Sequence, residues 1–266
     1  MRGEFDLQTV HSQLGIIVFH LLILLRSLSS FVSVSFISGL ASVDMSLYDK
    51  IIHYQTEIWQ SIGQTFVMVG ISLAAAILLG LPVGTLLYLS RRGQMYENRT
   101  VSVAVNSLVN ITRSFPFLLL VVFLIPFTRL LVGTSIGTIA ASVPLAIVAI
   151  AHYARLAEQS LLEIPRGVIE AARSMGSTKL QIILKFLYPE ARSGLVLGLT
   201  SSTISFISYS TVVGIVGGGG VGDFAIRYGY QRFEMDITVF IIILMIILVQ
   251  GVQHVGSRLA TWLDKR

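Results

Sequence analysis

The sequence predicts an all-α protein that crosses a membrane several times, and three observations lead to this fold class. Hydrophobic residues make up 54% of the 266 residues and charged residues only 12%, whereas soluble domains carry roughly 25% charged residues. The apolar residues are gathered in stretches near the roughly 20 residues that a helix needs to span the hydrocarbon core. Since lipid offers no hydrogen bonds to the backbone, such stretches must be helical. Basic residues, finally, fall mainly between alternate stretches.

Five stretches are predicted to be the core transmembrane helices. Four of them are apolar throughout or nearly so: 66–89, 136–153, 194–216 and 237–255. The remaining stretch, 101–125, is long enough but contains Arg113. We therefore expect one polytopic membrane domain over residues 45–266, with little chain left for a folded soluble domain.

The N-terminal extension, residues 1–44, contains two apolar runs separated by Arg26. Three interpretations fit it: a sixth span, an uncleaved signal, or a segment translated from a start codon upstream of the true one. A secretory signal has a positively charged leader, but two acidic residues outweigh Arg2 here. We favour a peripheral or spurious segment, with Met45 as the start of the membrane domain.

The orientation follows from the basic residues, because cytoplasmic loops carry an excess of lysine and arginine. On one side of the predicted spans lie twelve: Arg91, Arg92, Arg99, Arg155, Arg166, Arg173, Lys179, Lys185, Arg192, Arg258, Lys265 and Arg266. On the other side lie four: Lys50, Arg129, Arg227 and Arg232. The long middle loop and the C-terminus are therefore predicted to be cytoplasmic. The net charge of +5 thus reflects topology, and a nucleic-acid partner is not expected.

The cytoplasmic loop 155–192 is too long for a simple connection between helices, which usually takes 2 to 8 residues. Gly176 is placed to end a short helix in the left-handed conformation. Thr178 and Gln181 have the spacing of a capping box that begins a second helix, which Pro189 would close. The pattern predicts two short helices in an L at the membrane surface. From these features alone, a mere tether between two spans fits equally well.

One motif in this loop is specific. Its residues are Glu170-Ala171-Ala172, three residues, Gly176, nine residues and Phe186-Leu187-Tyr188-Pro189. This run resembles the loop motif of ABC importer permeases, E-A-A, three residues, G, nine residues, I, any residue, L-P. Phe186 and Tyr188 replace two aliphatic residues and leave the packing of the second helix in question. Further runs, such as 112–117, 125–129, 132–137 and 227–230, are most similar to the methionine importer permeases, a likeness that covers about 65–266.

The resemblance implies a set of partners and a location. The chain would be a multi-pass permease of the bacterial inner membrane, with a cytoplasmic C-terminus, paired as a homodimer. Two ATP-binding cassette subunits would bind ATP and Mg²⁺, and an extracytoplasmic binding protein would deliver methionine or a close relative. The chain itself would be neither an enzyme nor the holder of a cofactor or metal. Its ATPase-docking coupling helix would comprise Glu170, Ala171, Ala172, Arg173, Met175 and Gly176.

The residues inside the predicted spans offer few polar candidates for a translocation path. Arg113 would cost roughly 2.5–3.5 kcal/mol at the bilayer centre, so it should face protein or water, unless it lies off-centre and extends to the interface. The stretch 194–216 is rich in hydroxyl side chains, which pack helices closely; part of this stripe, with Ser205 and Tyr209, is a candidate lining. His152 is expected to be an interfacial anchor.

The energy source distinguishes the rival functions. All fourteen acidic residues lie outside the predicted spans, whereas ion-coupled carriers usually keep carboxylates within the membrane. No phosphate-binding loop of the G-x-x-x-x-G-K-[S/T] type is present, and 217–220 is interpreted as a flexible outer turn. A secondary transporter or channel without an ATPase is therefore the less favoured alternative. A membrane-embedded enzyme would need a cluster of His, Asp or Glu at membrane depth, which the sequence does not contain.

Overall fold

The computed structural model describes residues 47–264. The chain forms two compact units, Met1–Asp49 and Lys50–Arg266, and only the second is described to any extent. The predicted extension 1–44 lies outside the described residues. Over 47–264 every regular element is helical, which confirms the predicted all-α class. Four of the helices are long and apolar enough to cross a membrane, or five if one bent pair is counted as a single span.

The first span is a continuous helical stretch, Gln55–Ser90. It follows the short helix α2 (Leu47–His53) and comprises α3 (Gln55–Ala75), the π-helical turn η1 (Ala76–Gly80) and α4 (Leu81–Ser90). Pro82 stands at the start of α4, where its missing N–H would break an ordinary α-helix. The wider π turn, which ends two residues before Pro82, absorbs the change of hydrogen-bond register.

The expected continuous helix over 101–125 is wrong. The chain forms α5 (Arg99–Ser114) and α6 (Phe117–Phe123), which are bent by 105° relative to each other. The cause is Pro116, because a residue that precedes proline is pushed out of the helical region, and Phe115 is extended with φ −70° and ψ 131°. A short helix, α7 (Ile125–Val132), follows and ends at the left-handed Gly133.

Helix α8 (Thr138–Leu162) packs against α3, α4, α5 and α11. It extends well beyond the predicted stretch 136–153, so Glu158 lies inside a helix that meets the criteria for a membrane span. Glu158 thus lies outside the predicted apolar stretch, as expected, but it is 2% exposed. Burial is possible because the carboxylate is paired with arginine side chains.

The middle loop is shorter than expected, because helices enter it from both ends. After α9 (Arg166–Ser174), the elements α10 (Lys179–Gln181), η2 (Ile182–Leu187), α11 (Tyr188–Val213) and η3 (Gly214–Gly218) form one stretch, Lys179–Gly218. Pro189 was expected to close a separate short helix, and this is wrong. As at Pro82, a π turn ends two residues before the proline and lets the helix continue.

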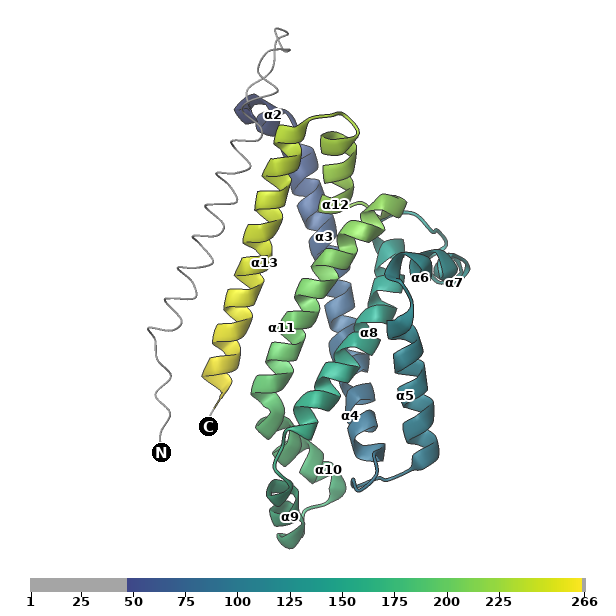
Figure 1. Ribbon diagram of the computed structural model, residues 1–266, viewed down its shortest axis with the longest axis vertical. Helices are drawn as coiled ribbons and strands as arrows, with labels where there is room; N and C mark the ends of the chain where they lie inside the picture. Colours follow the sequence, from purple (N-terminus) through teal and green to yellow (C-terminus); the bar gives the residue numbers. More distant parts are fainter. Residues whose placement is uncertain (1–46, 265–266) are drawn as a thin grey trace. The chain divides into compact units, whose positions relative to one another are not determined.

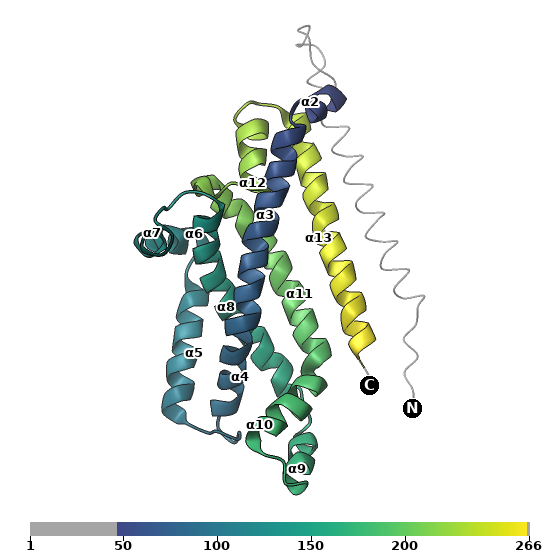
Figure 2. The ribbon, with the colours of Figure 1, turned by 180° about the vertical axis from the view of Figure 1, so that it is seen from behind.

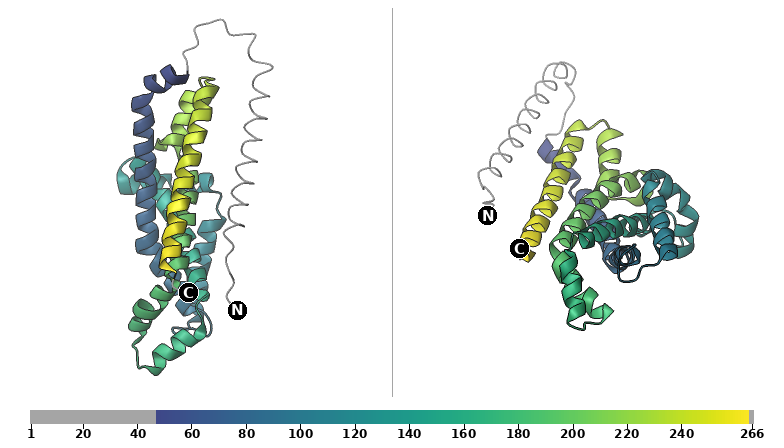
Figure 3. Two further views of the ribbon diagram at one scale, coloured as in Figure 1. Left: turned by 90° about the vertical axis from the view of Figure 1, so that its left-hand side faces the viewer. Right: turned by 60° about the horizontal axis from the view of Figure 1, so that its bottom comes forward.

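The chain ends with α12 (Val221–Phe224), the π-helical turn η4 (Ala225–Tyr230) and α13 (Met235–Leu263). Helices α5, α8, α11 and α13 succeed one another across the unit (Figure 1, Figure 2). Helices α9 and α10 lie at one end and α12 at the other (Figure 1). The C-terminal end of α13 points toward the end that carries α9 (Figure 3), as expected if both face the same compartment.

Candidate functional site

The loop between α8 and α11 has the local structure that its sequence predicts. Gly176 is left-handed, with φ +73°, and the backbone N–H of Ser177 donates to the carbonyl of Ala172 at 3.1 Å. Thr178 and Gln181 form a reciprocal capping box. Helix α9 thus has a fixed end, and the chain turns sharply into the next helix.

A buried cluster holds this loop against the spans. Ala172 of α9 packs with Leu161 and Ile164 from the end of α8, with Ile182, Leu187 and Ala191 from the next helix, and with Tyr88 and Leu89 of α4. Most of these side chains are less than about a tenth exposed, and burial of each large apolar side chain contributes roughly 1.5–3 kcal/mol. The loop is therefore a packed element, and the interpretation as a mere tether does not fit.

Ala172 differs from its neighbours in the predicted docking segment. It is fully buried within this chain, whereas Met175 is 66% exposed and Glu170, Ala171, Arg173 and Gly176 are exposed as well. The small side chain of Ala172 therefore serves packing of α9 on its own bundle. The exposed face of α9 and its end carries Glu170, Ala171, Arg173 and Met175.

The loop between α4 and α5 touches the same region. Met95 packs against the cluster around Ala172, and the Lys179 ammonium lies 4.3 Å from the centre of the Tyr96 ring. Cation–π contacts at exposed sites contribute about 0.5–1 kcal/mol. A displacement of α9 would therefore also displace the residues at the beginning of α5 and at the end of α8.

The three predicted path residues lie apart. Arg113 is an exposed residue of α5, and within 47–264 no hydrogen bond, ion pair or ring contact joins it to Ser205 or Tyr209. Ser205 donates to the carbonyl of Ser201 at 3.1 Å. The Tyr209 ring stacks on Phe117 of α6, with ring centres 4.7 Å apart. Tyr209 therefore joins the outer end of α11 to the short helix after the bend.

Most hydroxyl groups of α11 bond within their own helix. Thr200, Thr203, Ser205 and Ser208 each donate to a carbonyl four residues earlier. Gly256 of α13 approaches Thr200 so closely that a Cβ there would lie 2.1 Å from Oγ1. The stripe thus contributes to close packing of α11 on α13, as small residues do between membrane helices.

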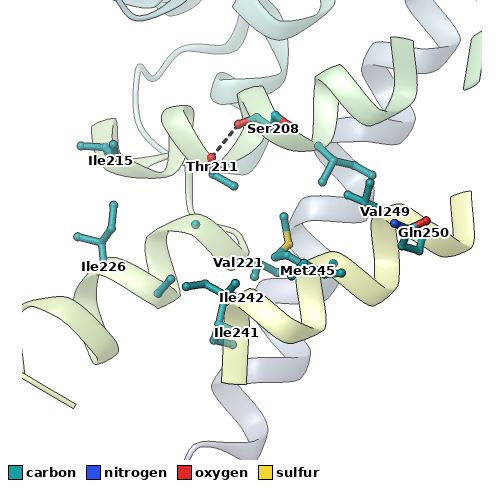
Figure 4. A pocket seen from close by; sticks show the side chains of 14 residues that line it. Ser208, Thr211, Ile215, Val221, Ile226, Ile241, Ile242, Met245, Val249 and Gln250 are labelled. Atoms are coloured by element: carbon teal, nitrogen blue, oxygen red, sulfur yellow. Dashed lines mark hydrogen bonds between the residues drawn. The ribbon is translucent and has the colours of Figure 1, made fainter. Parts of the chain in front are cut away.

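Two of the larger cavities within residues 47–264 border the spans. One, of about 550 Å³, lies between α11, the α12–η4 segment and α13, and isoleucine, valine and methionine side chains dominate its walls (Figure 4). Its polar lining residues are Ser208, Thr211 and Gln250, and the Thr211 hydroxyl donates to the carbonyl of Ser208. The other, of about 520 Å³, lies beside α5 and is lined by Ser107, Asn110, Ile111, Ser114, Phe115 and Pro116. The second cavity suits a polar solute better.

The glycine turn at 217–220 is held in place on both sides. The carbonyl of Gly217 accepts from the N–H of Gly137 at 2.9 Å, and Gln64 of α3 accepts from the N–H of Gly220 at 2.7 Å. Because these groups are already paired, the expectation of a freely flexible turn does not fit the structure. Beyond the turn, a side-chain hydrogen bond to Asp223 raises the pKa of Arg227.

One polar group near the end of α8 was missed by the sequence analysis. Arg155 contacts Glu158 on its own helix and Asn106 and Asn110 on α5. Two patterns could have indicated it: asparagines four residues apart in an apolar stretch, and an arginine three residues before a glutamate. Neither pattern specifies which helix lies opposite.

Comparison with known proteins places the chain in a family. The model of the binding-protein-dependent transport system inner membrane component matches residues 76–266. The probable D-methionine transport system permease protein MetI of Vibrio cholerae serotype O1 is 47% identical over 203 residues, 76% of this chain and 90% of that protein. The methionine import system permease protein MetP of Bacillus subtilis is 39% identical over 211 residues, 79% of this chain and 95% of that protein.

Solved structures agree. A chain from inward-facing conformations of the MetNI methionine ABC transporter matches with a TM-score of 0.78 and 41% identity, covering 83% of this chain and 100% of that one. A chain of an amino acid ABC transporter, at 19% identity and a TM-score of 0.67, shares the fold. These findings support the ABC permease interpretation. They give no support to the alternative of a carrier or channel that works without an ATPase. The chain belongs to the family of inner membrane components of binding-protein-dependent transport systems.

Proposed function

We propose that this chain is the membrane permease of a methionine importer and works as a homodimer. Two ATP-binding cassette subunits bind the cytoplasmic side and an extracytoplasmic protein delivers methionine or a close relative. The proposal for the substrate rests on relatives of 39 to 47% identity that are named for methionine or D-methionine transport. The C-terminus lies in the cytoplasm, as the distribution of basic residues indicates.

One observation carries the mechanism: α9 is exposed on one face and packed on the other. Its free face, with Glu170, Ala171, Arg173 and Met175, is available to an ATPase subunit. Its buried Ala172 joins the cluster that includes the ends of α8 and α4. Closure of two ATPase subunits on ATP and Mg²⁺ therefore displaces a packed unit of the permease, and the spans change between inward-facing and outward-facing access.

The path for substrate is proposed along the polar side of α5 and the outer part of α11. Arg113 offers a cation for the carboxylate of an amino acid, because it is exposed and has no ion-pair partner within 47–264. Ser205 and Tyr209 contribute from α11. Two copies of the chain would place two such surfaces opposite each other, and no covalent chemistry or metal is required of these side chains.

Co-purification with the ATPase subunit tests the docking surface. Gly176→Asp should release the ATPase, because the left-handed residue that ends α9 would gain a side chain and a charge. Gly133→Asp is a matched control: Gly133 also has a positive φ, +82°, and open space around it, but it ends α7, away from α9 in Figure 1. Equal loss of the ATPase from both variants would contradict a specific role of α9.

Uptake of labelled methionine into proteoliposomes tests the function as a whole. The permease, the ATPase and the binding protein together should accumulate methionine only with ATP and Mg²⁺. Competition by unlabelled L- and D-methionine measures stereochemical preference. Uptake that continues without any ATPase would overturn the proposal.

A further inference from the structure

A buried carboxylate lies where α4, α5 and α8 approach one another. Glu158 of α8 is 2% exposed. Its Oε2 lies 2.5 Å from Nη1 of Arg155, and its Oε1 lies 3.6 Å from Nη1 of Arg91, the residue that follows α4. The Glu158 carboxylate is thus paired with two guanidinium groups. Arg155 lies on the same helix, and Arg91 lies at the start of the loop to α5.

The same Arg155 also reaches across to α5. Its Nη2 donates to Oδ1 of Asn106 at 3.0 Å and to Oδ1 of Asn110 at 2.7 Å. The amide nitrogen of Asn106 donates to the carbonyl of Ser102 at 3.0 Å, which fixes the orientation of that amide with its oxygen toward Arg155. A single planar guanidinium, oriented by Glu158, therefore joins α5 to α8.

The apolar packing of α5 on α4 and α8 is centred on Val105 and Val109. Of its 16 residues only Val109 is buried, in a small apolar cluster with Leu87, Ala151 and Ala154. Among the described residues, the two bonds from Arg155 are the only side-chain hydrogen bonds between α5 and another helix. Arg155 thus supplies the polar part of the contact between α5 and α8.

The two ends of this network reach the two functional regions. Asn110 lines the polar cavity beside α5. At the other end, α8 continues from Glu158 to Leu161, which packs on Ala172 of the coupling helix. Arg91 begins the loop that carries Tyr96, and Tyr96 contacts Lys179. The network thus lies between the ATPase-docking region and the wall of the proposed path.

A buried ion pair contributes little net stability, because the cost of desolvation offsets its attraction. Its best supported use is to specify one arrangement among several. The planar fork of arginine can bond an acid and two amides at once, whereas lysine offers a compact point charge. The geometry therefore fits a role in positioning better than a role in stability.

We propose that Arg155, oriented by Glu158, is the positioning residue that makes α5 move with α8. A displacement of the coupling helix then reaches the wall of the substrate path. This inference rests on the proposed function and adds to it the link between the ATPase and the path.

The test uses the reconstituted complex of permease, ATPase and binding protein, with uptake per ATP hydrolysed as the readout. Arg155→Lys should lower this ratio roughly 5-fold or more, the range of typical coupling between sites, while hydrolysis continues. The double variant Asn106→Ala with Asn110→Ala should do the same, although it keeps the Arg155–Glu158 pair and leaves no buried charge unpaired. Arg92→Lys is the matched control, since Arg92 is an exposed arginine at the same end of α4.

A distance measurement separates positioning from general damage. The chain has no cysteine, so spin labels can be attached through Val103→Cys in α5 and Gln159→Cys in α8, both exposed positions. In the unsubstituted network, the distance should stay the same with and without trapped ATP; without Asn106 and Asn110 it should change or broaden on ATP binding. An unchanged ratio and distance in the variants would overturn this inference alone. Lack of ATP-driven uptake by the unmodified complex would overturn the proposed function, and the inference with it.

Discussion

The hydroxyl oxygen of Thr65 in α3 accepts a hydrogen bond from the backbone N–H of Val221, and the two atoms lie 3.0 Å apart. Thr65 is buried. A Cβ at Gly220 would lie 2.8 Å from the same oxygen, so the approach requires glycine. The bond fixes the turn after α11 to a helix 156 residues earlier in the chain.

Replacement of Thr65 by valine should destabilise the protein. Valine keeps the shape but leaves the buried N–H of Val221 without its acceptor, at a cost of about 1–3 kcal/mol. Thermal unfolding in detergent measures the change, and Thr65→Ser, which keeps the hydroxyl, is the control. Equal stability of the valine and serine variants would show that the bond contributes nothing.

Helix packing gives a second prediction through Gly84 of α4. A Cβ there would lie 2.4 Å from the backbone oxygen of Ala154 in α8, so Gly84→Ala should cost about 1–3 kcal/mol through overpacking. Gly70 of α3 has nothing within 4 Å of its Cβ position. Gly70→Ala should therefore gain about 0.5–1 kcal/mol from the helix preference of alanine. Relative to wild type, the unfolding temperature should fall for Gly84→Ala and rise for Gly70→Ala.

The two alanines of the coupling helix should respond differently to leucine. Ala172→Leu adds volume inside a full cluster and should destabilise the permease alone by about 1–3 kcal/mol. Ala171 is exposed, so Ala171→Leu should leave that stability unchanged and weaken ATPase binding. Unfolding of the isolated permease and a pull-down of the ATPase, carried out on both variants, measure the two effects. The reverse pattern would place the docking face on the other side of α9.

The hydroxyl stripe of α11 gives a prediction for transport. Ser205→Leu adds bulk to the proposed path, and Tyr209→Leu removes the ring that stacks on Phe117. Both should reduce methionine uptake while the ATPase still co-purifies. If uptake by the leucine variants equals that of wild type, α11 does not line the path at these positions.

Prolines show how far the spans could be predicted. The apolar stretches indicated where the chain crosses the membrane, and Pro116 breaks its helix, although the expected span continued through it. Pro82 and Pro189 do not end theirs, and each stands two residues after the end of a π-helical turn, whereas Pro144 lies inside α8 without such a turn. A proline in the sequence therefore does not by itself say whether the chain bends there or continues as a helix.

The sequence by itself determined the membrane class, the approximate spans and the turn at Gly176, because these depend on apolar run length and on local spacing. Only the tertiary structure decided that Ala172 faces its own bundle and that Glu158 is buried. It also decided that Arg155 bonds two residues of α5, 45 and 49 positions away. Such contacts depend on which helix faces which, and this follows from the packing of the whole unit rather than from any local pattern.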